Sequence, residues 1–360
     1  MKKTLLLTDV DFWRKDAGRK VRIVELVDFL SAHTHLTVVY IGAVHKADDD
    51  DPGRDLNYSL IFLEKKARLD PYQTGNLLQV FSQSHAFDCC IVEYIHLSFY
   101  LHYVPAGMKV ILDTHDIAGQ HSEMVTWPQQ AGDIYKVSKE TETQLFSLYH
   151  YIMVICEPDF ATLQTRIPEG KLLLCPHPAS VVDREIRPEA KNIGFVGSRY
   201  SPNKDAIQYF CHECWPLISQ DNEVHLNIYG KVISLLDEVR ATDTIHLKGW
   251  VGDVDQIYGC TDIIINPVRM GAGLKIKNIE ALANGLPLVT TSHGARGLEM
   301  AANEAFLVAD NPDDFAACVT RLIRDGELRK KISRNARCFI LEQFSLERCF
   351  RSLLKAIDNN

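Results

Sequence analysis

The segment GAGLKIKNIEALANGLPLVTT spans Gly271 to Thr291 and combines a glycine turn, a short alanine-rich helix and an apolar strand. The apolar run TDIIINPV precedes it and is typical of a buried strand that ends near Pro267 or Val268. Strand, turn, helix and strand in this order are typical of a parallel sheet whose strands are connected through helices. The segment therefore indicates an α/β fold.

The same alternation runs through the rest of the chain. Strand-like runs of the first half are KTLLLTDV, LTVVYIGAV, DCCIVEY, KVILDTHD, YIMVICE and residues 171–175, and those of the second half include NIGFVGS, VHLNIYG and TIHLKGW. Between the halves, Pro176 to Asn192 contains three prolines and many charges without any periodicity, which predicts a linker. DDDDPGRD, Asp48 to Asp55, predicts a solvated loop. We expect an N-terminal domain at 1–180, a C-terminal domain at 181–340 and a final helix at 341–360.

Composition limits the class of protein. With 360 residues, 46% hydrophobic and 24% charged, the chain can form two cores. A net charge of −8 argues against a dedicated nucleic-acid binder, because such proteins cluster Lys and Arg. No run approaches the roughly 18 apolar residues of a membrane span. Asp9 and Asp11 interrupt the N-terminal apolar run, so it predicts a first strand and not a signal peptide.

The ten cysteines lack the spacing of a disulfide framework, which is typical of the reducing cytoplasm. CHEC, Cys211 to Cys214, has the spacing of half a zinc site but no second pair of ligands. We interpret it as helix packing, with zinc as the alternative.

The glycine turn has features of an anion site. Gly271 and Gly273 allow the backbone to approach a ligand, and a helix is predicted to start at Leu274 or Lys275. The free amides and the positive dipole end of a helix start favour phosphate oxygens. A turn of this kind suits a phosphate group.

Lys275, Lys277 and Glu280 add charged groups to this turn. The two lysines lie about 200° apart on a helix, so both reach one ligand only if Lys275 is still part of the turn. Glu280 shares a face with Lys277 and could accept hydrogen bonds from a ribose. The alternative is a solvated helix start with Lys277 and Glu280 as a surface pair.

The order of these elements resembles the family 4 glycosyltransferases (glycosyl transferases group 1). Three segments carry the resemblance: GAGLKIKNIEALANGLPLVTTSHGARGL at 271–298, NIGFVGSRYSPNKDAIQYF at 192–210, and ILDTHDI at 111–117. The resemblance implies the GT-B fold, two Rossmann-like doubly wound parallel-sheet domains facing across a cleft. It also implies that the first domain binds the acceptor, that the second binds the nucleotide-sugar, and that the last helix crosses back to the first domain.

The resemblance also implies roles for individual residues. Glu280 would bind the ribose, Arg199 and Lys204 would lie near the diphosphate, and His115, with Asp116 orienting its ring or capping the next helix, would lie near the reacting sugar. We expect His115 and Lys275 to be catalytic. The donor-binding residues expected are Gly18, Arg199, Lys204, Gly271, Ala272, Gly273, Leu274, Lys277 and Glu280.

The chain departs from the family pattern at Ala272. Many family members carry a glutamate eight residues before the ribose-binding one, and that position is Ala272 here. Backbone amides of the Gly271 to Gly273 turn are the expected substitute at the donor sugar.

A basic cluster follows the first predicted strand. It comprises Arg14, Lys15, Arg19, Lys20 and Arg22 around Phe12 and Trp13. The cluster could solubilise a helix, bind a phosphorylated acceptor or contact an anionic membrane surface.

The expected function is a retaining, metal-independent, hexosyltransferase-like glycosyltransferase. Its donor would be a UDP- or GDP-linked sugar, with no further cofactor, and its acceptor a glycan or lipid-linked glycan of the cell envelope. Such a protein would be cytoplasmic, with peripheral contact to the inner face of the membrane, and would not bind nucleic acid. A nucleotide-sugar epimerase of the same fold and a non-catalytic nucleotide-sugar binding protein remain alternatives.

Overall fold

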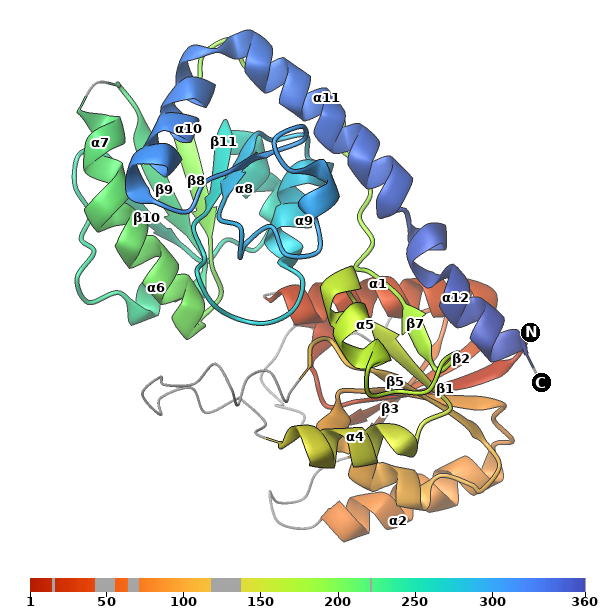
Figure 1. Cartoon of the computed structure of the whole chain (residues 1–360). Coiled ribbons are helices and arrows are strands. Elements are labelled where there is room, and N and C mark those ends of the chain that lie inside the picture. Colours follow the sequence, from red (N-terminus) through yellow and green to blue (C-terminus); the bar gives the residue numbers. More distant parts are fainter. Residues whose placement is uncertain (15–16, 43–55, 64–70, 118–136, 221, 360) are drawn as a thin grey trace. The chain divides into compact units, whose positions relative to one another are not determined.

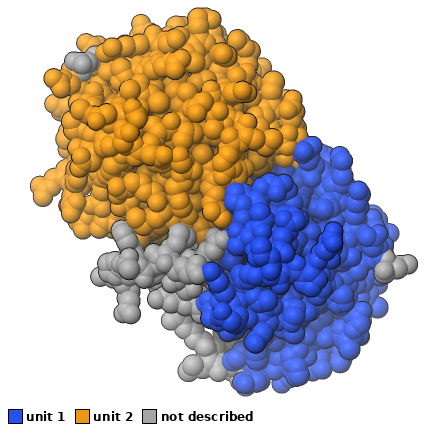
Figure 2. Space-filling view, in the orientation of Figure 1, with its two compact units in different colours: residues 1–125, 134–178, 346–360 blue, residues 126–133, 179–345 orange. Residues whose placement is uncertain are grey.

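The computed structural model describes residues 1–14, 17–42, 56–63, 71–117, 137–220 and 222–359. The chain divides into two compact units (Figure 2): unit 1 contains 1–125, 134–178 and 346–360, and unit 2 contains 126–133 and 179–345. Each unit has one parallel sheet flanked by helices (Figure 1). The predicted loop Asp48 to Asp55 lies outside the described residues.

The sheet of unit 1 has seven strands in the order β3-β2-β1-β4-β5-β6-β7, all parallel. The central strands are buried on both faces, which explains why they read as continuous apolar runs. The strands are β1 (Lys3–Thr8), β2 (His35–Ile41), β3 (Ser59–Leu63), β4 (Cys89–Glu93), β5 (Lys109–Asp113), β6 (Tyr151–Val154) and β7 (Leu172–Leu174). The helices are η1 (Phe12–Arg14), α1 (Gly18–His33), α2 (Pro71–Ser84), η2 (Ile95–Tyr103), α4 (Lys139–Ser147), α5 (Glu157–Gln164) and α12 (Leu346–Asp358).

The sheet of unit 2 has six strands in the order β10-β9-β8-β11-β12-β13, again all parallel. The strands are β8 (Asn192–Val196), β9 (His225–Tyr229), β10 (Ile245–Gly249), β11 (Ile263–Asn266), β12 (Leu288–Thr290) and β13 (Leu307–Val308). The helices are α6 (Ser201–Tyr209), η3 (Phe210–Cys214), α7 (Trp215–Ser219), η4 (Lys231–Leu235), α8 (Val254–Cys260), α9 (Ile276–Ala283), η5 (Glu299–Ala301), α10 (Pro312–Arg324) and α11 (Gly326–Gln343).

The strand order reverses once in each sheet. In unit 1 the reversal lies between β1 and β4, and in unit 2 between β8 and β11. Loops that leave neighbouring strands in opposite directions open a crevice at the carboxyl ends, which is where open α/β sheets bind ligands. The segments after β1 and β4 in unit 1, and after β8 and β11 in unit 2, therefore flank these crevices, and the end of β5 lies beside that of β4.

The last helix, α12, belongs to unit 1. Phe350 packs against Phe29 of α1 with ring centroids 5.2 Å apart, and the Ser352 hydroxyl donates to the carbonyl of Leu174 at 3.0 Å. α12 is thereby fixed on β7 and α1, beside which it lies in Figure 1.

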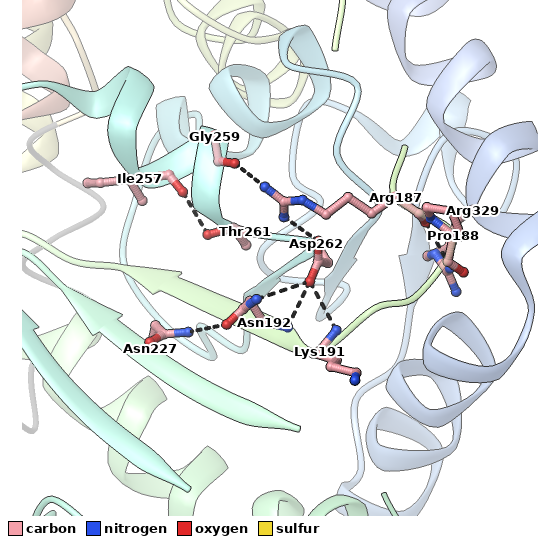
Figure 3. Close-up of polar contacts among 10 residues, drawn as sticks. All are labelled: Arg187, Pro188, Lys191, Asn192, Asn227, Ile257, Gly259, Thr261, Asp262 and Arg329. Carbon is pink, nitrogen blue, oxygen red and sulfur yellow. Dashed lines mark hydrogen bonds and ion pairs between the residues drawn. The ribbon is translucent and has the colours of Figure 1, made fainter. Parts of the chain in front are cut away.

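The predicted linker, Pro176 to Asn192, is attached along much of its length to unit 2 (Figure 3). Asp262 accepts hydrogen bonds from Arg187 Nη1 at 2.5 Å and from the amides of Lys191 and Asn192 at 3.0 and 2.8 Å. Arg329 Nη2 donates to the carbonyl of Pro188 at 2.6 Å. The segment lies outside any helix or strand until β8 begins at Asn192, and side chains such as Asp262 and Arg329 satisfy part of its backbone, which explains its lack of periodicity.

CHEC lies within a continuous helical stretch, where η3 is a π-helical turn. Pro216 has no N–H to offer the carbonyl four residues earlier, and the amide of Trp215 bonds to Phe210 five residues back. Cys211 and Cys214 are buried in the core while His212 is exposed, which confirms packing as the interpretation. All ten cysteines are free thiols. No helix in the described part of the chain is both long and apolar enough to cross a membrane.

Candidate active site

The glycine turn follows β11 and leads into α9, as the sequence predicts. Gly271 and Gly273 have φ values of 103° and 68°, in the region that L residues avoid. A Cβ atom on Gly271 would meet its nearest neighbour, Pro202, at 3.6 Å. Backbone conformation, and not lack of space, therefore requires glycine at 271.

Two side chains of unit 2 contact the carbonyl oxygens of this turn. Lys275 Nζ donates to the carbonyls of Gly271, Ala272 and Gly273 at 3.2, 3.1 and 3.0 Å, and His293 Nε2 lies 2.6 Å from the carbonyl of Gly271. The amides of residues 271–274 donate no hydrogen bond to the residues that the structure describes. The turn therefore keeps its acceptors engaged and its donors available.

Lys275 itself lies in the turn, at the N-cap position of α9. The side chain of Leu274 is buried and anchors the turn. Any contact of Ala272 or Leu274 with a ligand would involve the backbone, and their donor-binding role stays a prediction.

A buried polar network supports the turn from behind. Asn266, at the end of β11, donates to Asn278 Oδ1 at 2.7 Å, and Asn278 donates to the carbonyl of Gly294 at 2.8 Å. A Cβ atom on Gly294 would lie 2.1 Å from Thr290 Oγ1, so only glycine fits there. The sequence analysis missed these residues, although asparagine at the end of an apolar strand and in the first turn of a helix was a usable signal.

Lys277 and Glu280 point to separate partners. Lys277 Nζ donates to Asn203 Oδ1 at 2.7 Å and lies 4.6 Å from the Phe195 ring centroid. Burial, and then the charge of Lys275, lowers the pKa of Lys277 to about 7. Glu280 accepts from the Tyr258 hydroxyl at 2.8 Å, and burial raises its pKa. The alternative of a solvated surface pair is wrong, since the structure gives these two side chains other partners.

The segment after β8 contributes Arg199 and Lys204. Arg199 is exposed and forms no ion pair with the described residues, whereas Lys204 Nζ lies 3.0 Å from Asp237 Oδ2. Asn203, which sequence reasoning missed, is buried and donates to the carbonyl of Ser198 at 3.1 Å. The diphosphate role of Arg199 and Lys204 stays a prediction, and Lys204 would have to share its charge with Asp237.

Unit 1 holds a second polar group at the carboxyl ends of β4 and β5. Glu93, Asp113 and His115 are 0%, 0% and 6% exposed. His115 Nε2 lies 2.5 Å from Glu93 Oε2, and Arg22 of α1 donates to both oxygens of Asp113 at 3.0 and 2.9 Å. Glu93 was not predicted, and nothing in the local sequence pattern distinguishes it from any polar residue that ends a strand.

The backbone beside this group is strained. His115 and Tyr94 have φ values of 56° and 66°, which cost a non-glycine residue about 1–3 kcal/mol each. The two rings stack with centroids 4.1 Å apart and planes 10° apart. The predicted role of Asp116 at this ring stays a prediction, and Glu93 is the carboxylate at Nε2.

The predicted basic cluster does not form one surface. Arg22 is fully buried on Asp113, and Lys20 is buried with its ammonium 2.7 Å from Asp11. Arg14 lies 3.4 Å from Asp11, while Arg19 is exposed and Lys15 lies outside the described residues. The interpretations as helix solubilisation, phosphate binding or membrane contact are therefore wrong for Lys20 and Arg22. Gly18 is the first residue of α1, and its contact with the donor stays a prediction.

Glu93, Asp113 and His115 also have the composition of a metal site. They offer ligand atoms that all lie within 4.8 Å of one another. However, the guanidinium of Arg22 already occupies both oxygens of Asp113, and its charge would oppose a cation at the same place. The group fits a hydrogen-bonded network better than a cation site.

Two cavities of unit 2 lie elsewhere. A groove of about 940 Å³ borders α10 and the start of α11, and a cavity of about 300 Å³ borders residues 183–187. Neither is lined by a residue of the glycine turn. Polar geometry, and not cavity size, singles out the turn.

Comparison with known proteins bears on this geometry. Residues 190–325, which include β8, β11, the glycine turn and α9, match the family model described as Glycosyl transferases group 1. This segment of unit 2 is therefore similar to that family. The resemblance to glycosyl transferases group 1 that the sequence indicated is thereby confirmed for residues 190–325.

Similar proteins extend the comparison. A protein described as "Uncharacterized 44.6 kDa protein in cps region", from Klebsiella pneumoniae, is 26% identical over 175 residues, 46% of this chain. The match spans about half of that relative, 45% of its length.

Two solved structures match the whole chain. S. aureus TarM, in a complex with UDP, has a TM-score of 0.77 and 11% identity, covering 100% of both chains. Sucrose-phosphate synthase from Thermosynechococcus elongatus has a TM-score of 0.74 and 15% identity, covering 99% of this chain and 100% of the other. The predicted GT-B fold, with two Rossmann-like domains, is confirmed.

Proposed function

We propose that this chain is a glycosyltransferase whose unit 2 binds a nucleoside diphosphate sugar, UDP- or GDP-linked, at the carboxyl ends of β8 and β11. The observation that carries the proposal is the polarity of the glycine turn. Its carbonyls are engaged by Lys275 and His293, while its amides have no partner among the described residues. A row of free amides before a helix is suited to the oxygens of a diphosphate.

Lys277 and Glu280 complete this donor site in the proposal. The Lys277 ammonium would meet the diphosphate, and the Glu280 carboxylate, held by Tyr258, would accept hydrogen bonds from the ribose hydroxyls. Negative charge grows on the diphosphate as the sugar leaves. Donors fixed in advance stabilise that charge more in the transition state than in the ground state.

The acceptor would be a hydroxyl of a glycan or lipid-linked glycan bound by unit 1, with His115 near the reacting sugar. Transfer would retain the configuration of the sugar and require no metal ion. The name of the Klebsiella relative, which places it in the cps region, and the UDP bound to TarM support a UDP-sugar and a role in envelope polysaccharides. The protein would then work in the cytoplasm, with peripheral contact to the membrane.

The test begins with thermal unfolding in the presence of UDP-, GDP- and ADP-sugars. Stabilisation by one donor is expected, because a ligand that binds only the folded state raises its stability by mass action. Glu280→Ala should reduce this shift at the same donor concentration, and Glu304→Ala, which removes an exposed carboxylate of the same unit, should not. No shift with any donor, or equal shifts for both variants, would contradict the donor site.

Incubation of the stabilising donor with and without acceptor then separates the possible activities. Transfer that depends on a glycan acceptor is the expected result. Conversion of the donor sugar without acceptor would identify an epimerase, and binding without turnover would identify a non-catalytic binding protein.

A further inference from the structure

Glu93 and Asp113 form a pair of buried carboxyl groups in unit 1. β4 and β5 are parallel neighbours, and their register places Glu93 opposite Asp113. Two buried carboxylates side by side repel each other unless each has its own partner. The fork of Arg22 takes both oxygens of Asp113, and the His115 imidazole takes one oxygen of Glu93. Both oxygens of Asp113 are thereby engaged by Arg22, and His115 Nε2, 3.9 Å from Asp113 Oδ2, lies much closer to Glu93.

The second oxygen of Glu93 strengthens this dependence. Glu93 Oε1 is buried and has no hydrogen-bond partner among the residues that the structure describes. An unpaired buried oxygen is unfavourable, so the carboxylate depends on its contact with His115. The contact between Glu93 Oε2 and His115 Nε2 therefore holds the imidazole ring in its orientation.

The backbone restrains the same imidazole from another direction. The amide of Tyr94 donates to the carbonyl of Asp113 at 2.9 Å, which ties the end of β4 to the end of β5. The Tyr94 ring then lies parallel to the His115 ring. One face of the imidazole is covered by Tyr94 and its Nε2 is held by Glu93, so rotation of the ring is restricted.

We propose that Glu93 is a positioning residue that holds His115 with Nε2–H donated to the carboxylate, leaving Nδ1 to meet a sugar hydroxyl. A neutral imidazole carries one N–H, and the hydrogen bond made by one nitrogen decides the state of the other. Nδ1 then accepts a hydrogen bond from a hydroxyl of the donor or acceptor sugar. The inference rests on the proposed function, because it uses the predicted place of His115 at the reacting sugar.

The charge of Glu93 gives this arrangement a pH dependence. Burial and the neighbouring Asp113 raise the pKa of Glu93, and the hydrogen bond from His115 and the charge of Arg22 oppose the rise. Burial, and then the charge of Arg22, lowers the pKa of the neighbouring His177 to about 3, so His177 stays neutral. As pH falls, Glu93 is protonated at a higher pH than an ordinary carboxyl group, and the hold on His115 weakens.

Nitrogen NMR of the full chain tests the tautomer without reference to any activity. In protein labelled with ¹⁵N-histidine at pH 7.5, His115, assigned by the signals missing from His115→Asn, should be protonated at Nε2 only. Glu93→Gln should give a mixture of tautomers, because an amide can accept from or donate to Nε2. Glu169→Gln, which alters an exposed carboxylate of unit 1, should leave the spectrum unchanged. A mixed tautomer in the wild type, or an unaltered tautomer in Glu93→Gln, would overturn the proposal.

Kinetics test the consequence for transfer. Glu93→Gln should lower kcat at least about tenfold, keep the donor KM within about twofold, and remove the acid limb of the pH profile. Glu93→Asp keeps the charge on a side chain that is one methylene shorter. It should give an intermediate kcat and retain the fall in activity at acidic pH. It also replaces the glutamine variant if that variant does not fold.

The outcomes separate the two proposals. A wild-type protein without transfer would refute the proposed function, and the NMR result would then decide the role of Glu93 alone. Transfer that is equal in wild type and Glu93→Gln would overturn the positioning role. A stoichiometric divalent metal in the wild type that is lost in Glu93→Gln would overturn it too, in favour of a cation site.

Discussion

Binding of the donor is expected to take up a proton at Lys277 when the pH is above about 7. In the free protein, burial and the charge of Lys275 lower the pKa of Lys277 to about 7, while Glu280 works in the opposite direction. A diphosphate beside the ammonium would favour its charged form and raise this pKa. Between pH 7 and 10 the complex would hold a proton that the free protein lacks, so affinity should fall as the pH rises.

The size of the effect follows from the linkage of one proton. Affinity should decrease by at most about tenfold for each pH unit above 7, and by roughly 15-fold between pH 7, where Lys277 is already half deprotonated, and pH 8.5. Calorimetry should be done with an intact nucleotide-sugar, because its diphosphate lacks the terminal monoester that titrates near pH 6. Two buffers of different ionisation enthalpy at pH 8 then report the proton uptake directly.

Two lysine variants provide the comparison. Lys277→Met should bind about 10- to 100-fold more weakly at pH 6.5, the cost of one charge-assisted hydrogen bond, and should take up no proton. Lys330→Met, an exposed lysine of α11, should behave like the wild type. Identical binding enthalpies of the wild type in both buffers, or proton uptake that persists in Lys277→Met, would refute the reasoning.

Three further outcomes are expected. Glu280→Ala should weaken donor binding by about 1–3 kcal/mol, as measured by calorimetry. Tyr258→Phe should weaken it less, because the carboxylate remains. Equal affinity of Glu280→Ala and wild type would remove Glu280 from the site. Lys275→Ala should lower the melting temperature, because it releases the carbonyls of the turn. It should also lower the rate of transfer at saturating donor by about tenfold. An unchanged rate would show that the turn does not need the Lys275 ammonium. Since the pKa of His177 is lowered to about 3, the unfolded chain binds the extra proton, so the free energy of unfolding should fall as pH drops from about 6.5 to 3. His177→Leu should flatten that slope in denaturant titrations, and parallel slopes would contradict the lowered pKa.

The fold was largely predictable because its strands are buried on both faces and its helices connect them in sequence order. Continuous apolar runs identified β1, β4, β5, β8 and β11 without tertiary information. Two strands were not identified. β3, SLIFL, lies at the sheet edge and is mostly half-exposed, and β13 has only two residues. Neither carries the long apolar run that marks a central strand.

The candidate site was predictable only where its chemistry is local. Gly271, Gly273 and Lys275 lie within five residues, and the structure places all three in one turn. The pairing of Arg22 with Asp113 spans 91 positions. It depends on where α1 crosses the sheet, so Arg22 looked like a surface residue from its neighbours. Glu93 meets His115 through the register of β4 on β5, and periodicity along a single strand contains no information about register.

The two lysines of GAGLKIK have different partners in the structure, and this difference is compatible with alanine at position 272. Lys275 turns back onto three carbonyls, so its charge offsets the negative ends of the turn's own dipoles. A carboxylate at position 272 would lie three residues from this ammonium and compete with the carbonyls for it. With Ala272 the ammonium stays on the turn, the amides stay available, and Lys277 is left to meet a ligand. The loss of the first glutamate is therefore compatible with a turn that binds anions through its backbone, and Lys277, not Lys275, is the lysine whose charge a bound diphosphate should change.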